Sequence, residues 1–139
     1  MGNRVSFVPW VEDIHWVYAA IDVNANCSTR EPFGRSIPEA AAAGVPSVCF
    51  DDSGAAETIL DGCTGRVVPA ADESAFARAL IECLSIAPHP ETRANVRQNA
   101  LRFEAGAIAQ ELAEVVRRAA RSRRAGVPAD LCGVPAGPP

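Results

Sequence analysis

Residues 45–50, VPSVCF, are apolar almost throughout, and this short run constrains the fold more than any other part of the sequence. A strand that faces water on one side alternates apolar and polar residues, whereas a strand with both faces covered is continuously apolar. Residues 35–43 have helical character and end at Gly44, a common helix stop. A helix that leads into a buried strand is typical of a parallel sheet with helices on both faces.

The segments around this run continue the alternation of strands and helices. The apolar residues of the first predicted helix fall at i, i+3, i+4 and i+7 and therefore share one face: Ile14, Val17, Tyr18 and Ile21. The order βαβαβαβ predicts an α/β fold, a Rossmann-like parallel sheet with flanking helices and right-handed crossovers. The four predicted strands are 4–8, 21–27, 45–50 and 65–69, and the helices between them include 35–43 and 54–60.

From residue 73 the pattern is helical, and three helices separated at 88–91 and 104–106 give the chain a helical C-terminus. We predict one partial domain over 1–116, followed over 117–139 by an Arg-rich helix end and a disordered Gly/Pro/Ala tail. The run RRAARSRR at 117–124 has two interpretations. It either complements the helix dipole in solvent or contacts an anionic membrane surface.

Composition excludes several classes of protein. All 13 basic residues are arginine, so the chain has no lysine for a Walker A phosphate loop or a Schiff base. Residues 1–116 carry a net charge of −8 and residues 117–139 one of +4, so nucleic acid is not an expected partner of the body. Five cysteines without a CxxC pair indicate neither a disulfide framework nor a metal site. Without a recognisable signal or membrane span, the expected location is the cytoplasm.

The strongest candidate for a functional site is STREPFGRS, residues 28–36. It lies where a strand ends and a helix begins, the place at which open parallel sheets bind ligands. Gly34 allows a tight turn, after which the amides of about Gly34 to Ile37 are expected to point outward and attract a phosphate. Arg30 and Arg35 flank the turn and would add charge-assisted contacts.

Two carboxylates border this turn, Glu31 before the helix and Glu39 in its first turns. A carboxylate accepts from two vicinal hydroxyls at once, the arrangement that a ribose or a hexose presents. Phosphate contacts between two such carboxylates suit a nucleotide sugar. However, Ser36-x-x-Glu39 also matches the capping box, in which both side chains bond helix amides. Spacing does not choose between cap and site, and without a ligand we expect Glu39 to lean back toward the helix amides.

Other polar residues also have two interpretations. Ser53, with Asp51 and Asp52, follows the buried strand and either caps the helix 54–60 or contacts a ligand. Glu57 is either a helix-surface residue or a site acid. The two histidines are assigned structural or surface roles rather than catalytic ones: His15 and His89.

Taken in order, these residues resemble the C-terminal, donor-binding domain of the GT-B glycosyltransferases called group 1 or family 4. The resemblance rests on EPFGRSIPE, with seven residues between its two glutamates, on the continuation AAAAGVPSV and on DGCTGRVV. It extends from about residue 4 to 69, and the helices to about 116 fit the family's ending. The chain is thus expected to be part of the C-terminal domain of a GT-B enzyme, the C-terminal half of that domain.

The resemblance implies specific roles for the site residues. Glu39 would hold the ribose hydroxyls, and Glu31 would act as the catalytic carboxylate at the transferred sugar. The amides around Phe33, Gly34 and Arg35, with Ser36 in the same turn, would bind the diphosphate. The implied reaction is a retaining transfer from a nucleotide sugar that needs no metal and no other cofactor, to an acceptor that the sequence does not identify.

The chain also departs from the family pattern. Two strand–helix units, with an Arg and a Lys that bind the diphosphate, are not found before residue 4, and in the family they fall between the strands equivalent to 4–8 and 21–27. We therefore expect strand 4–8 to pair directly with 21–27, or the open edges to pair with an N-terminal domain or another chain. A truncated transferase without activity alone is the main hypothesis. The alternatives are a non-catalytic nucleotide-sugar-binding or interaction module and a related nucleotide-sugar epimerase.

Overall fold

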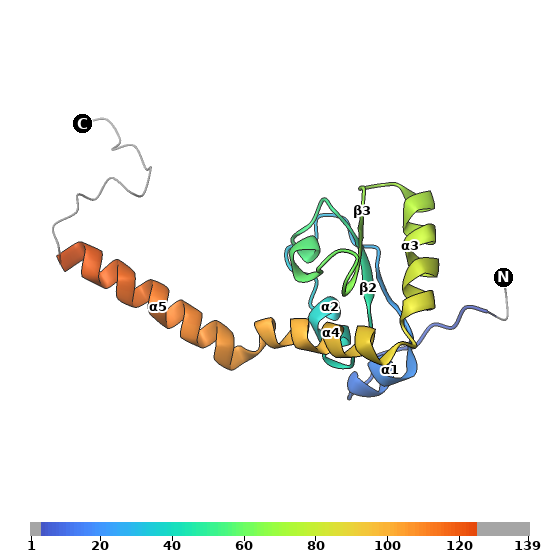
Figure 1. The fold of residues 1–139 in the computed structure, drawn as a ribbon, viewed down its shortest axis with the longest axis horizontal. Helices are drawn as coiled ribbons and strands as arrows, with labels where there is room; N and C mark the ends of the chain where they lie inside the picture. Colours follow the sequence, from blue (N-terminus) through green and yellow to red (C-terminus); the bar gives the residue numbers. More distant parts are fainter. Residues whose placement is uncertain (1–3, 125–139) are drawn as a thin grey trace. The chain divides into compact units, whose positions relative to one another are not determined.

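The computed structural model describes residues 4–124 and contains a parallel three-stranded sheet (Figure 1). Its strands are β1 (Asn24–Asn26), β2 (Ser47–Phe50) and β3 (Gly65–Val68), in the spatial order β1-β2-β3. Val48 of β2 is in register with Ala25 on one side and Arg66 on the other. The Rossmann-like sheet predicted from the sequence is confirmed, and each of these strands is shorter than its predicted range.

Both faces of β2 are covered, and each of its residues is buried. Val48 and Phe50 belong to the cluster under α3 (Glu73–Ile86), where the ring centroids of Phe50 and Phe76 lie 4.9 Å apart. Cys49 belongs to the opposite cluster under α2 (Ser36–Ala42) and η1 (Gly54–Thr58). Figure 1 shows α3 on one side of the strands and α2 on the other. The apolar run 45–50 thus fills the middle layer, as its composition predicted.

Two further helices tie these layers together. Tyr18 of α1 (His15–Ala20) packs in a small cluster with Ala40 of α2 and Val45. On α4 (Pro90–Ala100), the Asn99 amide donates to the Thr58 carbonyl at 2.8 Å, and Arg97 donates to the Ala43 carbonyl just after α2 at 3.1 Å. A short turn, η2 (Leu101–Phe103), ends this part of the chain.

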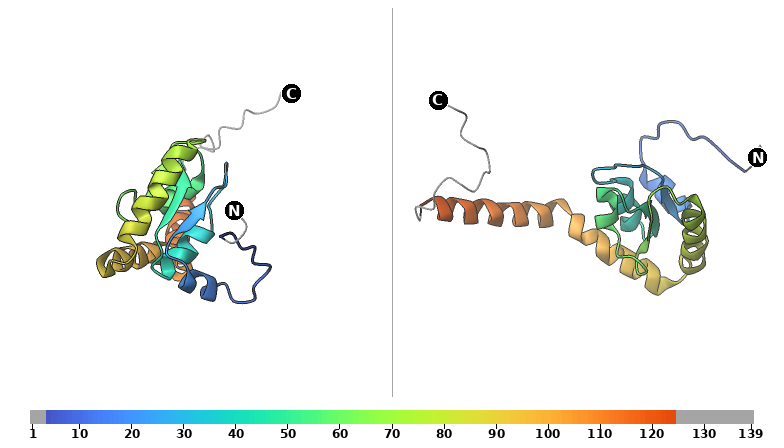
Figure 2. Two further views of the ribbon diagram at one scale, coloured as in Figure 1. Left: turned by 90° about the vertical axis from the view of Figure 1, so that its right-hand side faces the viewer. Right: turned by 90° about the horizontal axis from the view of Figure 1, so that it is seen from above.

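The predicted strand at 4–8 is wrong. Residues 4–9 form no strand, and β1 pairs with β2 and with no other segment among residues 4–124, so the expected direct pairing of 4–8 with 21–27 is also wrong. Figure 2 shows this segment as an extended trace outside the sheet. The Phe7 side chain is 96% exposed. An alternating sequence becomes a strand only where a neighbour supplies hydrogen-bond partners, and none lies beside this segment.

The chain divides into two units, Met1–Phe103 and Glu104–Pro139. In the second, helix α5 (Ala105–Arg124) carries Ile108, Leu112, Val115 and Val116 as exposed apolar residues and an ion pair between Arg117 and Glu114 at 3.4 Å. The expected boundary at 116/117 falls inside α5, and the predicted disordered tail lies outside the described residues.

No helix within 4–124 has the length and apolar character needed to cross a membrane. Contact of 117–124 with an anionic membrane surface stays a prediction.

Candidate functional site

The carboxyl end of β1 fixes the start of α2 through two asparagines. Asn26 is buried and donates from Nδ2 to the Ser36 hydroxyl at 3.3 Å, while its Oδ1 accepts from the Ser28 amide at 3.0 Å. Asn24 donates to the Ser47 hydroxyl at 3.1 Å. The polar end of the strand 21–27, visible in the sequence, therefore anchors the loop 28–36 and the first turn of α2. Ser36 is a structural acceptor in this arrangement.

Gly34 shapes the loop because no other residue fits its position. Its φ is +72°, in the left-handed region, and a Cβ placed there would lie 2.8 Å from the Ala55 Cβ. The loop also touches η1 through its backbone, where the Gly54 amide donates to the Glu31 carbonyl at 2.8 Å. Arg30 has a positive φ of 57° as well. The loop is thus held closely against η1.

The amides expected to be free for a phosphate are only partly so. Gly34 donates its N–H to Glu31 Oε1 at 3.2 Å, and Ile37 donates to the Gly34 carbonyl at 2.9 Å. Within residues 4–124, the amides of Arg35 and Ser36 donate to no protein acceptor. Two of the four amides that the sequence suggested are therefore occupied, that of Gly34 by the Glu31 carboxylate and that of Ile37 by the Gly34 carbonyl.

The capping box predicted for Ser36 and Glu39 is wrong. The helix begins one residue earlier than that box requires: Arg35 is the N-cap, in helical conformation and without a side-chain cap bond. Glu39 does not lean back toward the helix amides. Its Oε2 accepts from the Tyr18 hydroxyl at 3.0 Å and its Oε1 from Arg35 Nη2 at 3.3 Å. The carboxylate is therefore held by two side chains and not by the helix amides.

Tyr18 is the functional neighbour that the sequence did not reveal. Its place on the apolar face of the first helix predicted a core residue, and its ring is indeed buried. Burial and, second to it, the hydrogen bond to the Glu39 carboxylate together raise the pKa of Tyr18 to about 12. The phenol therefore stays protonated at neutral pH and can always donate to Glu39.

The side chains of Glu39 and Arg35 line a cavity of about 500 Å³. Its opposite wall is the segment 8–14, including the 93% exposed Trp10 and the half-exposed Ile14. The carboxylates of Glu39 and Glu12, the Arg35 guanidinium and several apolar side chains thus surround one space. The remaining lining residues are Val8, Pro9 and Val11.

The other predicted site residues lie around the loop but do not line this cavity. The Phe33 ring packs edge-on against Phe103 at 5.7 Å between centroids. Ser53 stands at the N-cap of η1 without capping it, and its hydroxyl donates to the Phe50 carbonyl at 3.2 Å. Asp51 accepts from the Ala70 amide at 2.8 Å instead of capping η1, and Glu57 is exposed on η1. Side-chain capping of 54–60 by these residues is therefore wrong.

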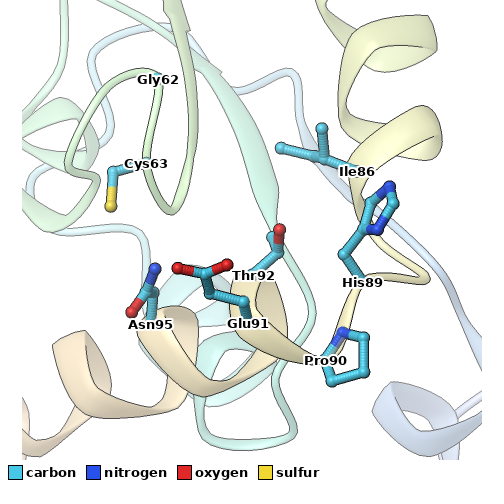
Figure 3. Close-up of a pocket in the computed structure, with 8 residues that line it drawn as sticks. All are labelled: Gly62, Cys63, Ile86, His89, Pro90, Glu91, Thr92 and Asn95. Atoms are coloured by element: carbon cyan, nitrogen blue, oxygen red, sulfur yellow. The ribbon is translucent and has the colours of Figure 1, made fainter.

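Neither histidine lines this cavity. The His15 ring contacts the Asp13 carboxylate at 2.8 Å on the surface. His89 stands at the N-cap of α4 and lines a second cavity of about 500 Å³ near the amino end of β3 (Figure 3). Figure 3 shows the Cys63 side chain, on the loop before β3, pointing toward the side of the cavity that α4 forms with Glu91 and Asn95.

The sequence matches a known family. A sequence model for the family described as Glycosyl transferases group 1 matches residues 1–85. The D-inositol 3-phosphate glycosyltransferase of Mycobacterium sp. (strain KMS) is 35% identical over 102 residues, which are 72% of this chain and 23% of that protein. The lipopolysaccharide core biosynthesis mannosyltransferase LpcC of Rhizobium leguminosarum bv. viciae is 34% identical over 114 residues, 78% of this chain and 32% of that protein.

Solved structures agree with this match. The sucrose-phosphate synthase of Thermosynechococcus elongatus superposes with a TM-score of 0.74 at 30% identity, over 87% of this chain and 31% of that one. The Anabaena protein Alr3699/HepE in complex with UDP gives a TM-score of 0.73 at 34% identity, over 84% of this chain and 33% of that one. The chain thus spans about a third or less of the proteins it resembles.

Proposed function

The chain belongs to the group 1 glycosyl transferases, and from that premise we propose that it is the donor-binding part of a transferase that uses a nucleotide sugar. The observation that carries the proposal is the Glu39 carboxylate. It is held by Tyr18 and Arg35 at the edge of a cavity with an apolar wall. A nucleoside matches these two features, because its aromatic base can pack against the apolar wall and its ribose offers two adjacent hydroxyls to the carboxylate.

The proposed pose follows the chemistry of the cavity. The ribose hydroxyls donate to Glu39, and the base lies against the apolar wall near Trp10. The diphosphate lies at the loop, where the Arg35 side chain and the free amides of Arg35 and Ser36 are donors. Arg30, on the same loop, is a second candidate for its negative charge. Determination of the Anabaena protein with UDP and with UDP-glucose makes uridine nucleotides the first probes to use.

We extend the proposal to the role of Glu31. One of its oxygens accepts from the Gly34 amide, which leaves the second oxygen as an acceptor for hydroxyls of the transferred sugar. In a retaining transfer the bond from the anomeric carbon to the diphosphate oxygen breaks, the acceptor hydroxyl forms its new bond on the same face, and its proton passes to the departing diphosphate. Carboxylate contacts to the sugar would stabilise the positive charge that develops at that carbon. The expectation that no metal is required belongs to this proposal.

Activity is proposed only for a longer assembly. No described residue of the first unit is a candidate for holding the acceptor, and the matched part of each relative is about a third or less of its length. The 139 residues alone are therefore proposed to bind the donor without transferring its sugar. A non-catalytic nucleotide-sugar-binding module would bind in the same way and is the second candidate.

Isothermal titration calorimetry with UDP and UDP-glucose tests the binding step. Glu39→Ala should weaken binding by about 10- to 100-fold, the loss expected for a hydrogen-bonded charged group. Glu57→Ala is the matched control, because Glu57 is an exposed glutamate outside the cavity. Equal affinity of wild type and Glu39→Ala would remove the ribose assignment. Turnover of UDP-glucose by the isolated chain would disprove its proposed inactivity.

A further inference from the structure

The contact between Tyr18 and Glu39 joins two elements that are far apart in the sequence. The Tyr18 hydroxyl donates to Glu39 Oε2 at 3.0 Å across 21 residues. The ring is 7% exposed and packs with Ala40 and Val45, so the core fixes the position of the hydroxyl. Tyr18 does not line the cavity into which Glu39 opens. It therefore acts on that cavity only through the carboxylate.

Counting acceptor positions shows what this contact does to Glu39. A carboxylate offers about four lone-pair positions, two on each oxygen. Tyr18 occupies one on Oε2 and Arg35 one on Oε1. One position remains on each oxygen, and two adjacent hydroxyls need acceptors in that arrangement. The affinities for a ribonucleotide and for its 2′-deoxy analogue should differ most when both carboxylate oxygens are held in place.

Of the two donors, Tyr18 is the one with a fixed position. The Arg35 side chain is 85% exposed, and an exposed ion pair at i,i+4 restrains its partners weakly. The phenol is buried, and its hydrogen bond to a charged acceptor belongs to the stronger class. The orientation of the carboxylate thus depends mainly on Tyr18.

We propose that Tyr18 is a positioning residue that orients the Glu39 carboxylate for two vicinal hydroxyls, so that the site selects ribonucleotides over 2′-deoxyribonucleotides. This inference rests on the proposed function, because it assumes that Glu39 binds ribose. Tyr18 does not touch the nucleotide. Its effect is confined to the selectivity between sugars that carry or lack the 2′-hydroxyl.

Calorimetry with UDP and 2′-deoxy-UDP tests the selectivity in wild type, Tyr18→Phe and Glu39→Ala. Wild type should prefer UDP by about tenfold or more, the cost of one unmade hydrogen bond to a charged group. Tyr18→Phe keeps the ring in the core, and it should weaken UDP binding while leaving 2′-deoxy-UDP binding nearly unchanged. The preference should then fall to about threefold or less, half of that free-energy difference. A residue with a merely structural role would weaken both nucleotides equally.

The outcomes separate this inference from the proposed function. If wild type binds neither nucleotide, or binds both equally, the ribose contact of Glu39 fails and the inference fails with it. If wild type prefers UDP and loses that preference in Glu39→Ala but keeps it in Tyr18→Phe, only the inference fails.

A second measurement needs no nucleotide. Tyr18 is the only tyrosine in the chain, so tyrosinate absorbance after a rapid pH jump reports this residue alone. The titratable groups facing the hydroxyl are Glu39 and Arg35, and the wild-type pKa is expected at about 12. Glu39→Gln should lower the pKa while burial keeps it above that of free tyrosine. An identical pKa in wild type and Glu39→Gln would show that the contact is absent in solution.

Discussion

At the scale of single residues, the loop between β1 and α2 depends on the missing side chain of Gly34. An alanine there would have to adopt a φ of +72° and bring its Cβ to 2.8 Å from that of Ala55. Such a conformation costs of order 1–3 kcal/mol before the clash is relieved. Gly34→Ala should therefore lower the free energy of unfolding by about 2 kcal/mol or more, measured by urea denaturation.

The control for that substitution is Gly106→Ala in α5. A Cβ at Gly106 would meet its nearest atom, Glu104 Oε1, only at 3.8 Å, and its backbone is helical. Alanine favours a helix over glycine by about 0.8–1 kcal/mol, so this change should cost nothing. A Gly34→Ala protein as stable as Gly106→Ala would show that the loop has another conformation in solution.

The buried cysteines give a second prediction at this scale. Burial raises the pKa of both Cys49 and Cys83 to about 11, whereas Cys27 and Cys63 are exposed. The thiolate is the reactive form, so iodoacetamide at mildly alkaline pH should label Cys27 and Cys63 and spare the other two. Mass spectrometry of a Cys132→Ser protein checks this, with urea-unfolded protein as the control. Equal labelling of the four cysteines in the folded protein would contradict the described core.

The same scale shows what local spacing can and cannot predict. Gly34 and Gly44 were correctly predicted as a turn and a helix stop, because the ability to adopt a positive φ without steric cost is a property of glycine itself. The spacing of Ser36 and Glu39 left a capping box and a ligand site open and led us to expect Glu39 near the helix amides, but Asn26 bonds Ser36 and Tyr18 bonds Glu39 instead. Those partners come from other elements, and no spacing rule within one helix includes them.

At the scale of elements, composition predicted a strand well only where burial decides it. The run 45–50 is apolar on both faces and became the central strand β2. The segment 4–8 has the alternating pattern of a half-buried strand but has no neighbour to complete a ladder, so it remains outside the sheet. Strand formation depends on partners as well as on the segment, and a pattern within the segment contains no information about those partners.

Helix α4 provides the prediction at this scale. Its Asn99 is buried and donates to the Thr58 carbonyl at the end of η1, so Asn99→Ala leaves a buried carbonyl without its donor. Losing this bond should lower the free energy of unfolding by about 1–3 kcal/mol. Asn95→Ala, an exposed asparagine on the same helix, should change it by less than about 0.5 kcal/mol. Thermal or urea unfolding of the two variants checks this. Equal effects on the free energy of unfolding would rule out a stabilising hydrogen bond between α4 and η1.

At the scale of the whole molecule, the candidate site is assembled from α1, the loop 28–36, α2 and the segment 8–14. The sequence pointed to the loop as a candidate because it lies between a strand and a helix, and the family resemblance then implied roles for its two carboxylates. It did not predict that Tyr18 holds Glu39 or that residues 8–14 form the opposite wall, since both depend on how separate segments pack. These contacts all lie in the first of the two units, Met1–Phe103.

That division predicts the behaviour of a shortened chain. A protein ending at Phe103 retains the sheet, the three apolar clusters and every described contact of Glu39, so its unfolding midpoint and UDP affinity should equal those of the full chain. Unfolding followed by circular dichroism, together with calorimetry, checks both quantities. The matched control ends at Ala87, which removes α4 and with it the bonds of Asn99 and Arg97, and it should fold poorly. Loss of UDP binding on removal of 104–139 alone would mean that these residues supply part of the site.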